Sequence, residues 1–145
     1  MPVRKRESVY EFSERYEDLN RVFNEVLYLG HYETQYDAMS VAVERPARRF
    51  YVSEQRLAEV INQIESGREE RLPNRKSPKY EMFMELYRRY RELAARKPHL
   101  SKMELCTEVI YQPAPKFYMN PSWGIKILYE GRRRRRHHHR RRDAQ

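Results

Sequence analysis

The sequence predicts an all-α protein made of two tandem three-helix, helix-turn-helix-like units and a disordered basic C-terminal tail. Apolar residues recur at three- and four-residue steps, a short segment occurs twice at a spacing of 67 residues, and the last fourteen residues are mostly arginine and histidine. The predicted domains are residues 8–67 for the first repeat, 68–79 for a linker, 80–131 for the second repeat and 132–145 for the tail.

The duplication is clearest around two prolines. Residues 46–53 align with residues 113–120, and the proline, alanine, phenylalanine and tyrosine of this segment are identical in the two copies. At the same offset Thr34 meets Ser101, each followed three residues later by an acid, which is the pattern of a helix N-terminus. Apolar residues also meet apolar residues over about 45 aligned positions, so we interpret the match as an internal repeat.

The first repeat is expected to contain three helices. The first covers residues 9–28, and the second, 35–44, is terminated by Pro46. An extended Phe-Tyr segment follows, and the third helix covers residues 54–66, with Gly67 just beyond its end.

The second repeat is expected to follow the same order. Its helices cover residues 79–96, 102–111 and 121–130, with Pro113 after the second helix and Pro121 at the start of the third. Gly124 in the third helix and Gly131 just beyond it stand where the first copy has a leucine and an isoleucine, which makes the apolar face poorer.

The positive charge is concentrated at the ends of the chain. The net charge of +9 contains +7 from residues 132–145, whereas residues 7–131 sum to −1. The body is therefore nearly neutral, which argues against a fold whose whole surface binds nucleic acid. The tail is expected to be disordered because it is too polar to build a core.

Arginine-rich segments favour phosphate, which a guanidinium binds with two parallel hydrogen bonds. We expect phosphate contacts from the tail and from the connection before each third helix. These residues are Arg132, Arg133, Arg134, Arg135, Arg136, Arg140, Arg141 and Arg142 in the tail, with Arg48, Arg49 and Lys116 in the connections. A localisation signal and a solvated tail without a fixed partner are the alternatives for the arginine run.

A short capped helix followed by an amphipathic one is similar to a helix-turn-helix, whose second helix enters the major groove. The candidate base contacts on the third helices are Gln55, Arg56, Asn62, Gln63 and Lys126, with Ser122 and Trp123 as further candidates. The eight-residue connection is longer than the usual turn of that motif. The alternative is two small helical bundles that bind protein, and the Phe-Tyr pairs either stack on bases or pack in the core.

We find no catalytic residues, no metal site and no cofactor motif. Cys106 lies on an apolar helix face and is expected in the core, and three adjacent histidines at 137–139 point to alternate sides in an extended chain. The sequence contains no apolar run long enough to predict a membrane span or a secretory signal. The single cysteine suits a reducing compartment. We expect a location in the cytoplasm, associated with the nucleoid, or in a virion.

One resemblance supports that context. The segment 100–105, Leu-Ser-Lys-Met-Glu-Leu, followed by 113–118, Pro-Ala-Pro-Lys-Phe-Tyr, resembles a pattern in small uncharacterised tandem-repeat proteins of Bacteroidetes mobile elements and phages. The resemblance covers residues 10–131, and its specific part is the Pro-Ala-x-(Arg/Lys)-Phe-Tyr motif. It implies no established activity and no site residues. The two copies differ within the motif, since Arg48 stands where the second copy has Pro115.

The sequence therefore predicts a non-enzymatic nucleic-acid-binding protein, with double-stranded DNA favoured over RNA. The tail would neutralise phosphates and the helical repeats would position it. The alternative is a structural or assembly protein of a phage particle or another large complex, in which the repeats contact a protein partner or a second copy of the chain.

Overall fold

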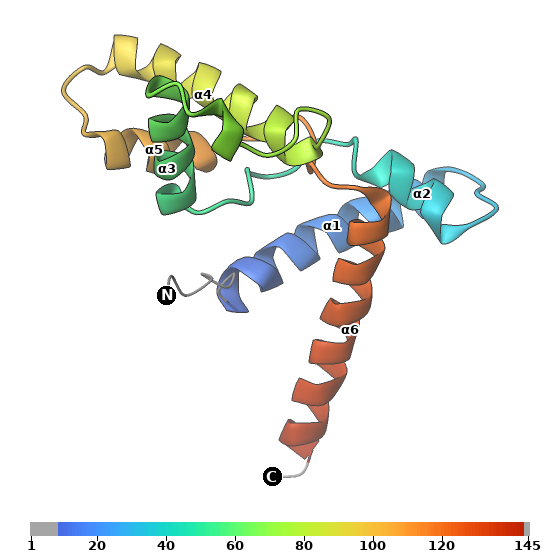
Figure 1. Ribbon diagram of the computed structural model, residues 1–145. Helices are drawn as coiled ribbons and strands as arrows, with labels where there is room; N and C mark the ends of the chain where they lie inside the picture. The colour runs from blue at the N-terminus through green and yellow to red at the C-terminus, as the bar shows by residue number, and fades with distance from the viewer. Residues whose placement is uncertain (1–8, 144–145) are drawn as a thin grey trace. The chain divides into compact units, whose positions relative to one another are not determined.

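The computed structural model describes residues 9–143, with side chains described for residues 10–137. Its described residues form an all-α fold, which confirms the predicted class (Figure 1). The helices are α1 (Val9–Leu29), α2 (Gln35–Ala42), α3 (Glu54–Glu65), the short 3-10 helix η1 (Glu69–Arg71), α4 (Pro78–Arg96), α5 (Lys102–Ile110) and α6 (Pro121–Asp143). Among them, none offers a stretch apolar enough to cross a lipid bilayer.

The helix starts agree closely with those expected, because the same capping chemistry operates in both halves of the chain. The Thr34 hydroxyl accepts a hydrogen bond from the third backbone N–H of α2, and Ser101 does the same for α5. Ser53 caps α3 in this way, and Ser77 caps α4, whose first residue is a proline. Each cap satisfies a backbone donor that has no partner inside the helix.

The chain folds into two compact units that do not follow the predicted domain boundaries. Of the described residues, 9–45 and 120–143 form the first unit, and 46–119 form the second. In the first unit α1, α2 and α6 pack on one another, and in the second α3, α4 and α5 do. Each unit therefore has the three helices expected of a repeat, but the third helix comes from the other copy. The predicted contiguous repeats 8–67 and 80–131 are replaced by units that exchange α3 and α6.

The duplicated Pro-Ala segments explain this exchange. Ala47 and Ala114, which are equivalent residues of the two copies, exchange both backbone hydrogen bonds at 3.0 Å and form an antiparallel bridge. The ring of Phe50 stacks on Tyr118, and the ring of Tyr51 stacks on Phe117, with centroids 5.9 and 6.3 Å apart. The two bridging hydrogen bonds are related by exchange of the two copies, and so are the two ring pairs, which is the pattern of a local two-fold axis.

The same pairing removes the helix-turn-helix. That motif needs two consecutive helices packed against each other, whereas α2 and α3 belong to different units, as do α5 and α6. Each connection contains a proline and no glycine, and its backbone is hydrogen-bonded to the equivalent segment. The connection is therefore held extended and does not form a tight turn.

Two glycines of α6 match it to the first unit. A Cβ at Gly131 would overlap the buried ring of Tyr16, and one at Gly124 would lie 2.7 Å from the sulfur of Met39. The positions equivalent to Met39 and Gly124 in the second unit hold Cys106 and a leucine. A large residue on one helix is thus accompanied by a small one on the other in each unit, as close packing requires. The glycines that made the predicted helix look poor are sites of close helix approach.

A charged triplet is also repeated at the offset of 67 residues. The two triplets are Asp18, Arg21 and Glu25 in α1, and Glu85, Arg88 and Glu92 in α4. In each, the arginine lies 2.7 or 2.6 Å from the first acid and also pairs with the second, one helical turn further on. The hydrogen bond from Arg88 lowers the pKa of the Glu85 carboxyl. The repeat therefore preserves an ion-pair network in addition to the core, with Asp18 buried in the first copy.

The tail departs from the predicted disorder. Helix α6 continues through the arginine and histidine run and ends at Asp143 (Figure 1). Arginine has a high helix propensity, so a run attached to a folded helix extends it at little cost. Contacts to α1 and to Glu130, described below, hold the first turns of this extension.

Cutting the linker tests the exchange of helices. With a protease site inserted after Pro73, cleavage should yield two fragments, α1–α3 and α4–α6, that stay together. Each unit contains helices from both fragments, so the halves should elute as one species in native size-exclusion chromatography and separate in urea. Separation of the cleaved halves in native buffer would contradict the exchange.

Substituting Gly131 by alanine tests the close approach of α6 to α1. An alanine in an exposed helix stabilises by about 1 kcal/mol relative to glycine. Here overpacking against Tyr16 costs about 1–3 kcal/mol and outweighs that gain, so urea unfolding should show a net loss. Arg132→Ala, at the exposed neighbouring position, serves as the control and should change stability little. An increase in stability for Gly131→Ala would show that α6 does not contact Tyr16.

Candidate nucleic-acid interface

The beginning of the arginine run is attached to α1. The guanidinium of Arg134 lies 3.9 Å from the centroid of the Phe12 ring. That of Arg135 lies 5.3 Å from the centroid of the Tyr16 ring and 3.8 Å from the carboxylate of Glu17. The two side chains are held in direction because guanidinium groups stack on aromatic rings and pair with carboxylates. They orient the basic stretch relative to the rest of the first unit.

Glu130, one turn earlier in α6, pairs with arginines of the same helix. Arg133 donates two hydrogen bonds to its carboxylate, at 3.0 and 2.7 Å, and Arg134 donates a third at 3.1 Å. The bonds from Arg133 and Arg134 lower the pKa of the Glu130 carboxyl to about 2. The three residues keep a net positive charge, and the pairs favour helix over coil because they join residues three and four apart.

Two arginines of the run make fewer contacts with other side chains than Arg133, Arg134 and Arg135 do. Arg132 and Arg136 are exposed and have no ion pair with any group in the described part of the chain, and His137 beside them is exposed as well. For Arg140, Arg141 and Arg142 the described residues give only the helical backbone, so the predicted phosphate contacts of these side chains lie outside the described side chains. Within the arginine run, Arg132 and Arg136 are thus the residues with described side chains that are best placed to contact phosphate.

The connections before α3 and α6 offer less than predicted. Arg49 is 5% exposed, lies 4.1 Å from the centroid of the Tyr111 ring and donates hydrogen bonds to the backbone oxygens of Phe50 and Val52. Its predicted role as a phosphate ligand is therefore wrong, since it holds the connection in place. Lys116 lies 2.6 Å from the carboxylate of Glu81, which already neutralises it. Arg48 is exposed.

The candidate base-reading residues of α3 do not form one surface for a groove. Gln55 and Asn62 are exposed, and Asn62 accepts a hydrogen bond from Lys102 of α5. Arg56 lies 3.4 Å from Glu59 and 5.7 Å from the centroid of a phenylalanine ring of α4. The side-chain oxygen of Gln63 is buried. Most of these side chains contact other residues of the second unit or are partly buried in it.

Other predicted roles are resolved by burial. Cys106 is fully buried, which confirms its place in the core, and burial raises the pKa of its thiol. Phe50, Phe117 and Tyr118 are also buried, so the Phe-Tyr pairs pack on each other and do not present faces for bases. The described residues hold no group of three or more His, Cys, Asp or Glu side chains placed to bind a metal.

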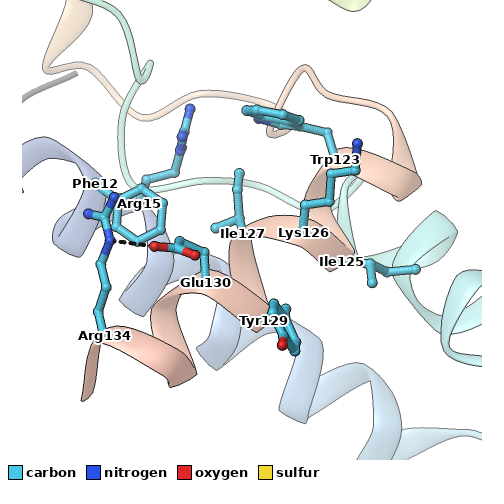
Figure 2. Close-up of a pocket in the computed structure, with 9 residues that line it drawn as sticks. All are labelled: Phe12, Arg15, Trp123, Ile125, Lys126, Ile127, Tyr129, Glu130 and Arg134. Carbon is cyan, nitrogen blue, oxygen red and sulfur yellow. Dashed lines mark hydrogen bonds and ion pairs between the residues drawn. The ribbon is translucent and has the colours of Figure 1, made fainter. Parts of the chain in front are cut away.

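A groove of about 600 Å³ runs along α6 beside the start of α1 (Figure 2). Its lining residues are Phe12, Arg15, Trp123, Ile125, Lys126, Ile127, Tyr129, Glu130 and Arg134. Lys126, a predicted base contact, is exposed and lies 6.0 Å from the centroid of the Trp123 ring. Trp123 is itself 49% exposed. The groove thus combines an apolar floor with cations and an accessible aromatic ring, and it leads toward the arginine run.

Sequence reasoning missed the α1 side of this site. The apolar spacing of residues 9–28 predicts a helix, but it does not connect Phe12 or Glu17 to Arg134 or Arg135. The signal was indirect. Glycines at 124 and 131 marked the face of α6 that contacts other helices, and the arginines one turn beyond Gly131 continue that face.

The acid titration of Glu130 tests its pairing with Arg133 and Arg134. A carboxyl whose pKa is lowered in the folded state stabilises that state above its ordinary pKa of 4.5 and loses this contribution as the pH falls toward about 2. The NMR carboxyl signal of Glu130 should therefore titrate near pH 2. Replacing Arg133 and Arg134 with glutamine should bring the midpoint back toward 4.5. A midpoint of 4.5 in the unaltered protein would mean that the arginines do not hold Glu130.

Compared with protein-family models, curated proteins and solved structures, the chain matches none. The site is therefore interpreted from its own geometry.

Proposed function

We propose that this chain is a non-enzymatic nucleic-acid-binding protein that binds double-stranded DNA through the basic end of α6. The observation that carries the proposal is the presentation of the arginine run on a helix attached to α1. Such a protein would act at the nucleoid of a cell or inside a virion.

A helical run favours DNA over RNA duplexes. The major groove of B-DNA, about 12 Å wide, admits an α-helix, whereas the major groove of A-form RNA is too narrow for side chains to read. Basic regions that lie in the major groove as continuous helices are a known mode of DNA binding. Arginines on successive turns would neutralise phosphates on both sides of the groove and displace counterions.

The attachment to α1 changes how the function should be tested. Removing residues 132–145 would delete charge together with the contacts of Arg134 and Arg135 to α1. A loss of binding would then have two causes. Substitution of arginine by glutamine is cleaner, because glutamine also has a good helix propensity and removes the charge alone.

The decisive experiment is a salt series of duplex DNA binding. If six to eight arginines engage phosphates, the logarithm of the binding constant should fall with the logarithm of salt concentration with a slope of about −5 to −7. Replacing Arg132, Arg133 and Arg136 with glutamine should reduce the magnitude of this slope by about 2–3. Fluorescence anisotropy of a labelled duplex measures both.

A matched control removes three charges elsewhere. Arg68, Arg71 and Arg75 are exposed arginines of the segment between α3 and α4. Their replacement with glutamine changes the net charge equally and should leave the slope unchanged. If the two triple variants changed the salt slope equally, the binding would be a general attraction by net charge and not a contact of α6 with phosphates. Absence of binding at low salt would overturn the proposal.

A second candidate function is a structural or assembly protein of a phage particle or another large complex. Exposed apolar side chains on the first unit favour it, since Tyr28 at the end of α1 is 89% exposed and Leu29 and Tyr36 are exposed beside it in sequence. A protein that shows no duplex binding at low salt and forms oligomers dependent on Tyr28 and Leu29 would support this second function.

A further inference from the structure

We propose that the groove beside Trp123 binds an unpaired nucleotide, so that the protein prefers duplex DNA that carries a single-stranded overhang. The inference rests on the proposed function and extends it from a contact with phosphates to a contact with a base. Its occupant is single-stranded DNA, held by stacking on Trp123 and by the cations that line the groove (Figure 2).

The aromatic surface comes first. Trp123 is nearly half exposed although it lies in the first turn of a helix whose next turns are packed, and its ring borders the groove. An indole offers a large flat face, and stacking of a base on such a face contributes about 1–3 kcal/mol with little sequence preference. Bases in a duplex are already stacked on each other. An unpaired base is therefore the partner that a surface tryptophan can accept.

The charges around the groove suit a nucleotide backbone. Arg15 of α1 and Lys126 and Arg134 of α6 line it, against one acid, Glu130. Glu130 is engaged by Arg133 and Arg134, so its charge is compensated. The apolar part of the lining includes Phe12 and Ile125, both half-buried, which give a phosphate no partner but fit the edge of a base; Arg134 lies over the Phe12 ring.

The spacing connects the groove to the arginine run. Trp123, Ile127, Glu130 and Arg134 follow one another at four-, three- and four-residue steps, which places them on one face of α6. At a rise of about 1.5 Å per residue this face measures roughly 16 Å from Trp123 to Arg134. A base on Trp123 thus leaves room for the following phosphates to reach the arginines.

The protein carries its own probe, because Trp123 is the one tryptophan in the sequence. Stacking of a base on the indole should quench its fluorescence. Three duplexes are compared with the full chain: a blunt one, one with a thymidine overhang, and one with an abasic overhang of the same phosphate count. Only the thymidine overhang should quench Trp123, and it should bind at least about fivefold more tightly than the abasic one.

Variants separate stacking from folding. Trp123→Ala should remove the preference for the thymidine overhang and keep the affinity for the blunt duplex, whereas Trp123→Phe should keep part of the preference. Tyr28→Ala, which removes an exposed aromatic outside the groove, should behave like the unaltered protein. The fluorescence measurement needs no variant, so a folding defect in Trp123→Ala would not obscure the result.

The outcomes are distinguishable. Equal binding and equal fluorescence with thymidine and abasic overhangs would overturn the groove inference while leaving the blunt duplex bound, as the proposed function requires. Loss of binding to all three duplexes at low salt would overturn the proposed function itself. Quenching by the thymidine overhang that persists when Lys126 and Arg15 are neutralised, with unchanged affinity, would contradict the role given to the groove cations.

Discussion

The two Pro-Ala-x-(Arg/Lys)-Phe-Tyr segments hydrogen-bond to each other, and this pairing determines which helices can pack together. Ala47 and Ala114 exchange backbone hydrogen bonds, and the four aromatic rings that follow stack in two cross-copy pairs. Because each segment is held extended by its equivalent, the chain cannot turn back after α2 or after α5. Helix α3 therefore joins α4 and α5, and α6 joins α1 and α2.

That assignment gives the basic helix its support. On the predicted contiguous arrangement α6 would pack on its own copy, and its glycines would have no explanation. In the first unit Gly131 meets Tyr16, and the arginines one turn later meet Phe12 and Glu17. The aromatic and acidic residues of α1 thus align a segment whose charges repel one another. A core contact, a charge network and a candidate binding surface occupy consecutive turns of a single helix.

Local signals in the sequence were sufficient for the elements but not for their partners. Caps at Thr34 and Ser101 and prolines at 46 and 113 act over a few residues, so the helix starts could be predicted from them. The exchange of α3 and α6 depends on contacts between segments that lie 67 residues apart in the sequence. The apolar pattern of either helix suits packing in either unit. The burial of Arg49 could not be predicted either, because Tyr111, whose ring its guanidinium contacts, is distant in the sequence and is brought to it only by the fold. The tail was predicted to be disordered from its composition. Composition does not show that the tail continues a helix that begins eleven residues earlier, at Pro121.

The exchange of helices also has a kinetic consequence. Unit one joins α1, at the beginning of the chain, to α6, which is synthesised about a hundred residues later. Contacts between residues so distant raise the contact order of this unit and slow its formation. While the ribosome is still producing the second unit, α1 and α2 have their apolar faces uncovered, and a nascent chain in that state is prone to aggregate. The arginine-rich helix and the core of its unit consequently mature in the same step, so a chain interrupted before α6 would have neither.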